Sequence, residues 1–164
     1  MHDVLKDAEL FQGFGMDGIR RLSAIGRSRA LATGDYLFLL GDSAECLYVV
    51  AKGSLELCLP MPLGGVVKDI PVESATAGET LGWSAVVKPY RFTLSARAGE
   101  PAEVIGFPRH ELQQVFEAAP GLGIRFLTNL SELVGIRLLT FQALWVRELQ
   151  RTLAAGTQHR ANPD

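Results

Sequence analysis

The spacing of apolar residues changes twice along the chain and divides it into three parts. Residues 4–26 carry leucine, isoleucine and phenylalanine at intervals typical of short helices, with glycine near the middle. From residue 27, short apolar runs alternate with Gly-Asp and Gly-Gly steps, which supply the positive φ of tight turns. Helical spacing returns in residues 108–120, which begin with proline, and in the longer segment 121–155. The pattern predicts short helices, then a β-sandwich or barrel, then two helices.

Two apolar stripes run along the last predicted helix. One stripe contains Leu127, Leu130, Val134, Leu138, Phe141, Trp145 and Leu149, and the other contains Phe126, Leu133, Ile136, Leu144 and Leu153. A helix that is apolar over most of its circumference must be covered on more than one face. The β-rich part can cover one face, and a second copy of the helix is the simplest cover for the other, which predicts a homodimer. The alternative is an internal core that covers both faces.

Size and charge narrow the class of protein. A chain of 164 residues with 48% apolar residues suits one domain with a real core. Its net charge of −2 provides no basic field that would attract nucleic acid or an anionic membrane. There is no uncharged apolar stretch of about 18 residues and no secretory leader, so we expect a cytoplasmic protein without a membrane segment.

Candidate catalytic and metal-binding residues are sparse. The three histidines, His2, His110 and His159, are far apart, and none has a partner four residues away. No Gly-x-Ser-x-Gly, phosphate-loop or Cys-x-x-Cys motif occurs. The sequence therefore predicts neither an enzyme nor a metal site.

Several motifs resemble the cyclic nucleotide-binding domain of the CRP/FNR superfamily when they are taken in order. They are "LFQGF" at residue 10, "GDYLFLLGDSAECLYVVAKGSLEL" at residue 34 and "GETLGWSA" at residue 78. The resemblance implies a mainly β fold: an antiparallel, jelly-roll-like β-roll with N-terminal helices and a long C-terminal helix. It divides the chain into a domain at 1–156, made of helices at 1–26, the roll at 27–107 and helices at 108–156, and a polar tail at 157–164.

The resemblance also implies a function. Such domains bury a cyclic nucleotide against a phosphate-binding cassette, and their final helix forms a dimer interface. We therefore expect a regulatory module that senses cAMP, cGMP or another small anionic ligand, without a cofactor, and signals through its C-terminal helix to a partner. The partner would be a second copy or a separate effector protein. Only a short polar tail follows Leu153, where the family's transcription factors continue into a helix-turn-helix, so no direct DNA binding is expected.

The cassette supplies the candidate ligand-binding residues. They are Gly78, Glu79, Leu81, Gly82, Trp83, Ser84, Ala85, Arg91, Phe92 and Thr93. In such a cassette, backbone N–H groups hold the phosphate together with an arginine, and a carboxylate binds the ribose. Aligned with the family pattern, Trp83 takes the place of that carboxylate, and Phe92, or by one residue Arg91, takes the place of the arginine. A shift of one residue turns Arg91 away from the pocket unless the strand has a bulge.

Alternatives remain for Trp83 of the cassette and for two residues of the final helix. Trp83 either fills the space that ribose would occupy or offers a flat surface for a ligand or partner. Thr140 and Gln142, on the final helix, lie near positions where the family contacts the base, although such residues also bond their own helix or face solvent. If the pocket is degenerate, the chain is instead a ligand-free scaffold for interaction or dimerisation.

Overall fold

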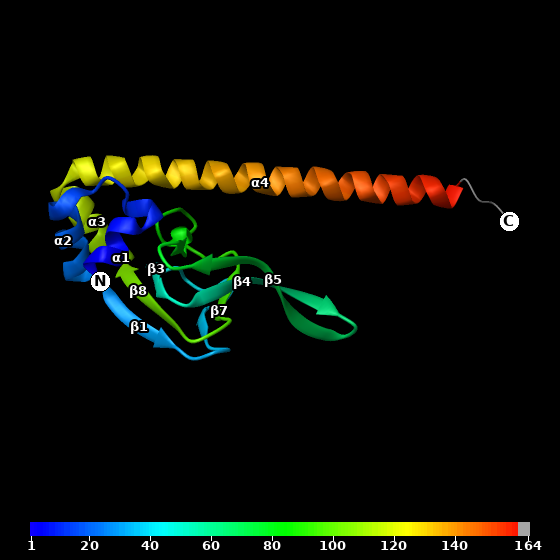
Figure 1. The fold of residues 1–164 in the computed structure, drawn as a ribbon, viewed down its shortest axis with the longest axis horizontal. Helices are drawn as coiled ribbons and strands as arrows, with labels where there is room; N and C mark the ends of the chain where they lie inside the picture. The colour runs from blue at the N-terminus through cyan, green and yellow to red at the C-terminus, as the bar shows by residue number, and fades with distance from the viewer. Residues whose placement is uncertain (161–164) are drawn as a thin grey trace.

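Two four-stranded antiparallel sheets form the centre of the computed structural model, which describes residues 1–160 and side chains up to residue 153 (Figure 1). The first sheet has the order β1 (Arg27–Leu31), β8 (Ala102–Pro108), β3 (Cys46–Lys52) and β6 (Thr80–Leu81). The second has the order β2 (Tyr36–Phe38), β7 (Ser95–Ala98), β4 (Ser54–Leu63) and β5 (Val66–Thr76). The predicted antiparallel β-roll is confirmed.

Helices precede and follow the roll. At the N-terminus lie α1 (His2–Asp7), the 3-10 turn η1 (Glu9–Phe11) and α2 (Gly15–Ile25), and after the roll come α3 (Arg109–Ala118) and α4 (Pro120–Arg160). Ala119 separates the last two with φ −143° and ψ 75°, because the residue before a proline is held out of the helical region. Helix α4 continues past residue 156, where the sequence predicted a polar tail, and residues 161–164 lie outside the described part.

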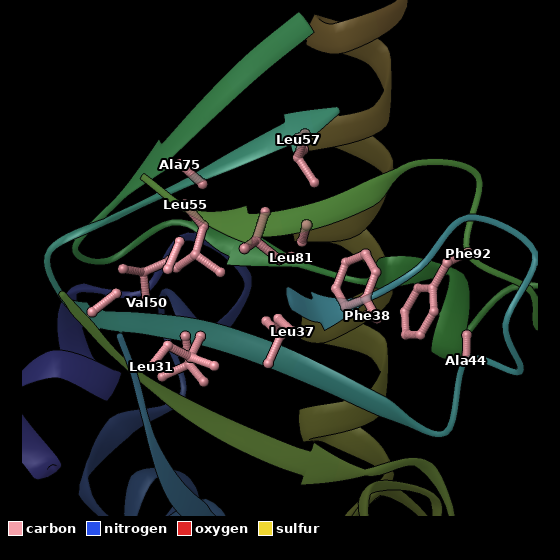
Figure 2. Packing of buried hydrophobic residues seen from close by; sticks show 14 of the residues in the cluster. Leu31, Leu37, Phe38, Ala44, Val50, Leu55, Leu57, Ala75, Leu81 and Phe92 are labelled. Atoms are coloured by element: carbon pink, nitrogen blue, oxygen red, sulfur yellow. The ribbon is translucent and has the colours of Figure 1, made fainter. Parts of the chain in front are cut away.

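The roll has two apolar cores, one on each side of the first sheet. Successive residues of a strand point to opposite faces, so Leu47 and Val49 of β3 pack under the helices while Val50 packs between the sheets. The core between the sheets contains Leu31, Leu37, Phe38, Leu55, Leu57, Leu81 and Phe92 (Figure 2). The core under the helices contains Leu10, Phe11, Leu22, Ile105, Phe107, Leu112 and Phe126.

A long hairpin of β4 and β5 extends from the roll beneath α4 (Figure 1). Leu63 pairs with Val66, so Gly64 and Gly65 alone form the turn. Their φ angles of 58° and 82° fit a two-residue hairpin turn in which both central residues are left-handed.

Among the side chains that the structure describes, those in the first part of α4 pack on the rest of the chain and those further along it are exposed. Phe126 and Leu130 are buried in the core under the helices, whereas the residues Leu138, Phe141 and Trp145 are 55–64% exposed. Figure 1 shows the helix running well past the roll. An internal core therefore does not cover both apolar stripes in the single chain. Among the described residues, no helix combines the length and apolar character needed to cross a membrane.

Candidate functional site

The cassette loop joins β6 to β7. Gly82 follows β6 with φ 72° and ψ 30°, and the 3-10 turn η2 (Trp83–Ala85) begins directly after it. A Cβ at Gly82 would lie 3.0 Å from the Phe92 ring and 3.2 Å from the Cys46 carbonyl oxygen. Both the left-handed backbone and the close approach require glycine here, so this residue fixes where the turn lies.

A pocket opens between this loop, the two sheets and α4. Its lining residues are Phe38, Leu57, Glu73, Leu81, Gly82, Trp83, Ser84, Phe92, Thr93, Leu94 and Arg137. Six of the predicted site residues are in this lining, namely Leu81, Gly82, Trp83, Ser84, Phe92 and Thr93. The walls are mainly apolar, and within the described lining one acidic and one basic side chain supply the charge.

Phe92 and Arg91 face opposite ways. Phe92 is 6% exposed and stacks on Phe38 with ring centroids 3.7 Å apart and planes 11° apart (Figure 2). Arg91 is exposed, and its Nη1 donates a hydrogen bond to the Gly41 carbonyl at 2.8 Å. Backbone bonds on both sides of Phe92, to Asp42 and from Gly41, hold this register. Of the two positions that the family pattern offers for the phosphate-binding arginine, Phe92 lines the pocket with its ring and Arg91 does not line it.

Three other predicted residues shape the loop without lining the pocket. Glu79 Oε2 accepts hydrogen bonds from the Thr76 backbone N–H at 2.6 Å and from its hydroxyl at 2.9 Å. Gly78 has φ 90° and donates its N–H to the Val50 carbonyl. Ala85 is fully buried in the core between the sheets.

Trp83 forms one wall of the pocket. It is half-buried, lines the cavity and also packs against the core under the helices. The indole thus joins the cassette loop to the helical side of the molecule, which matches the mixed surroundings that aromatic residues prefer.

Helix α4 contributes Arg137 to the pocket, and the candidates Thr140 and Gln142 lie beyond it. Both of these are exposed, and the Thr140 hydroxyl donates to the Ile136 carbonyl at 3.0 Å. Neither belongs to the lining. Arg137 was missed from the sequence, although a charged residue between Ile136 and Leu138 in an apolar stretch was a usable signal.

Arg137 connects α4 to the hairpin. Its Nη2 lies 3.3 Å from the Glu73 Oε1 of β5, with exposed side-chain fractions of 24% for Arg137 and 41% for Glu73. An ion pair with this degree of exposure contributes about 0–1 kcal/mol. The contact is therefore weak enough to be exchanged for contacts with a bound molecule.

Glu9 of η1 contacts Thr80 of β6, the strand before the cassette loop. Burial raises the pKa of the Glu9 carboxyl above its ordinary value. The Thr80 backbone N–H, which donates to Glu9 Oε1 at 2.8 Å, and the Arg137 charge oppose this rise. Glu9 thus joins the N-terminal turn η1 to the strand that leads into the cassette.

Replacing Glu9 with glutamine tests this account of its surroundings. Because the folded-state pKa is raised, folding favours the protonated carboxyl, and that stabilisation is lost as pH rises through the folded-state pKa. Glutamine still offers Thr80 an acceptor oxygen but carries no charge. As pH rises from the ordinary glutamate pKa of 4.5 through the raised folded-state pKa, the wild type should lose stability relative to Glu9→Gln in urea unfolding. Parallel stability curves for the two proteins would contradict the raised pKa.

The described residues contain no group of three or more His, Cys, Asp or Glu side chains placed to hold a metal ion.

Comparisons with known proteins agree with the fold. The family model "Cyclic nucleotide-binding domain" matches residues 28–119. The human patatin-like phospholipase domain-containing protein 6 is 34% identical over 119 residues, which are 70% of this chain and only 8% of that protein. The chain thus spans less than a tenth of the length of this curated relative.

Solved structures share the fold. A cyclic nucleotide-binding domain from Methylobacillus flagellatus superposes with a TM-score of 0.73 at 21% identity, covering 91% of this chain and 80% of that one. The catabolite activator protein of Thermus thermophilus gives a TM-score of 0.70 at 24% identity, covering 87% and 63%. These likenesses confirm the CRP/FNR-type fold that the motifs predicted. The family model matches more than half of this chain's residues, so the chain belongs to the cyclic nucleotide-binding domain family.

Proposed function

We propose that the chain is a cytoplasmic regulatory module in which a small ligand enters the pocket beside α4 and changes how α4 presents itself to a partner. The observation that carries this proposal is the position of Arg137. It belongs to α4, lines the pocket and pairs with Glu73 of β5. A ligand with an anionic group that takes over Arg137 would exchange the link between α4 and the hairpin for a link between α4 and the ligand.

The first partner in this proposal is a second copy of the chain. The exposed residues Leu138, Phe141 and Trp145 lie on one side of α4 at spacings of three and four. A matching helix from another copy would cover this stripe symmetrically. A separate effector protein would bind to the paired helices or to the roll in one of their arrangements.

The dimer is tested by placing a charge on the stripe. Phe141→Glu should shift the protein from dimer to monomer in sedimentation equilibrium, because a carboxylate in an apolar seam loses its hydration without gaining a partner. Ala143→Glu makes the same change in charge on the opposite side of α4 and should leave the dimer intact. A wild type that sediments as a monomer, or equal behaviour of the two variants, would contradict a homodimer through this stripe.

Coupling between the pocket and α4 is tested by hydrogen exchange. A ligand that binds saturably in calorimetry should change the exchange of amides around Arg137 in the wild type. Arg137→Gln should weaken binding and abolish that change. Binding that leaves α4 exchange unaltered would show that the pocket does not signal through this helix.

The second candidate function is a ligand-free scaffold. The stacked Phe38 and Phe92 rings favour it, because Phe92 stands at one of the two positions expected for a phosphate-binding arginine, and Arg91, at the other, lies outside the pocket lining. A scaffold predicts the homodimer but no heat with millimolar cAMP, cGMP or any other small ligand, and no effect of Arg137→Gln on association. Saturable binding of any small molecule at the pocket would exclude it.

A further inference from the structure

The charges around the pocket do not suit a ligand that is only an anion. Arg137 and Glu73 are the two charged side chains in the described lining, so their formal charges cancel. Glu9 lies close enough to Arg137 for the two charges to interact. Arg137 is thus already paired with the Glu73 carboxylate before any ligand arrives.

Within the described pocket lining, the cassette loop contributes no second cation. Arg91 is turned outward to the Gly41 carbonyl, and the neighbouring position is the buried Phe92 ring. A cyclic phosphodiester would therefore have to take Arg137 from Glu73 and then remain next to the Glu73 carboxylate. Like charges held side by side disfavour binding, and this arrangement selects against cyclic nucleotides.

The residues that line the pocket indicate that the uncharged part of the ligand is apolar and aromatic. Phe38, Phe92 and Trp83 line the pocket with aromatic rings, and Leu57, Leu81 and Leu94 line it with aliphatic side chains. Small-molecule sites are mostly apolar with a few placed polar groups that set orientation, and flat rings pack well on aromatic walls.

We propose that the pocket binds an aromatic α-amino acid as its zwitterion, an inference that rests on the proposed ligand-sensing function and names the ligand class. The ligand carboxylate binds the Arg137 guanidinium, the ligand ammonium binds the Glu73 carboxylate, and the ring lies among the aromatic walls. The two protein charges are 3.3 Å apart and of opposite sign, so a ligand with adjacent opposite charges can satisfy both. A carboxylate alone leaves Glu73 repelled, and an amine alone leaves Arg137 without a new partner.

The experiment is calorimetry on the full chain with four probes: L-phenylalanine, 3-phenylpropanoate, 2-phenylethylamine and cAMP. L-Phenylalanine should bind saturably, and each analogue with a single charge should bind about tenfold more weakly or worse. cAMP should give no saturable heat at millimolar concentration.

Substitutions test which charged side chain binds which group of the ligand. Arg137→Gln should weaken L-phenylalanine binding by about tenfold or more. Glu73→Gln removes the repulsion of a lone carboxylate, so the preference for L-phenylalanine over 3-phenylpropanoate should shrink. Arg91→Gln is the control, because Arg91 is exposed and outside the lining, and it should leave affinity unchanged.

The remaining outcomes separate the ligand class from the regulatory function. If 3-phenylpropanoate or cAMP binds as tightly as L-phenylalanine, the zwitterion is overturned, while a change in α4 exchange on that binding keeps the regulatory function. Equal loss of affinity in Arg91→Gln and Arg137→Gln would also overturn it, because the ligand would then contact the cassette arginine. If none of the four probes binds, the inference is overturned and the ligand-free scaffold is favoured.

Discussion

Alanine in place of Phe11 should lower the free energy of unfolding by about 3–5 kcal/mol, the usual loss for a buried aromatic ring. Phe11 is 1% exposed at the end of η1. Its ring contacts Phe14 at 5.4 Å, Phe107 of β8 at 5.2 Å and Phe126 of α4 at 6.1 Å between centroids. The substitution therefore removes a contact from the N-terminal helices, the roll and α4 at once. Urea unfolding followed by circular dichroism measures the loss.

A matched variant separates the lost ring from a general loss of apolar volume. Phe11→Leu keeps an apolar side chain at the site and should cost less than half as much as Phe11→Ala. Both variants should loosen the base of α4, which is seen as faster amide exchange around Phe126. A loss below about 1 kcal/mol for Phe11→Ala would show that the N-terminal helices contribute little to holding α4 on the roll.

Gly53→Ala should destabilise the protein by about 2–4 kcal/mol, because strain and overlap act together. Gly53 joins β3 to β4 with φ 71°, a region that costs residues with a Cβ about 1–3 kcal/mol. An added Cβ would also lie 2.4 Å from the Pro101 carbonyl oxygen and 3.0 Å from Ala102 Cα. Both neighbours are backbone atoms, so the overlap can be relieved only by moving the turn that leads into β8. Thermal or urea unfolding measures the effect.

Gly34→Ala is the control for this substitution. Gly34 has φ 90°, and an added Cβ would meet no atom within 4 Å. Gly34→Ala should therefore lower the free energy of unfolding by the backbone strain alone, about 1–2 kcal/mol. Equal losses at the two glycines would mean that the turn at Pro101 shifts freely and that the overlap adds nothing.

The sequence indicated the pocket residues that belong to the cassette and missed those that β5 and α4 contribute. Gly82, Trp83 and Phe92 belong to one local motif, which a single sequence can reveal, and all three line the pocket. Glu73 and Arg137 come from β5 and α4, and neither stands in a recognisable motif. They meet because the hairpin and the long helix extend in the same direction from the roll (Figure 1). Contacts between segments so far apart in the sequence depend on packing that local spacing does not encode.

The sequence by itself determined the elements of this protein, since strand alternation, helical spacing and glycine turns are local properties of the chain. It also indicated that α4 carries more apolar surface than a single roll can cover, and the exposed stripe agrees with this. Only the tertiary structure decided which of two adjacent residues faces the pocket. A difference of one residue reverses the face of a strand, and the backbone pairing of Phe92 with Gly41 and Asp42 fixes that choice. The same packing placed Arg137 against Glu73, because the position of a helix over a sheet is set by the side chains between them and not by either segment alone.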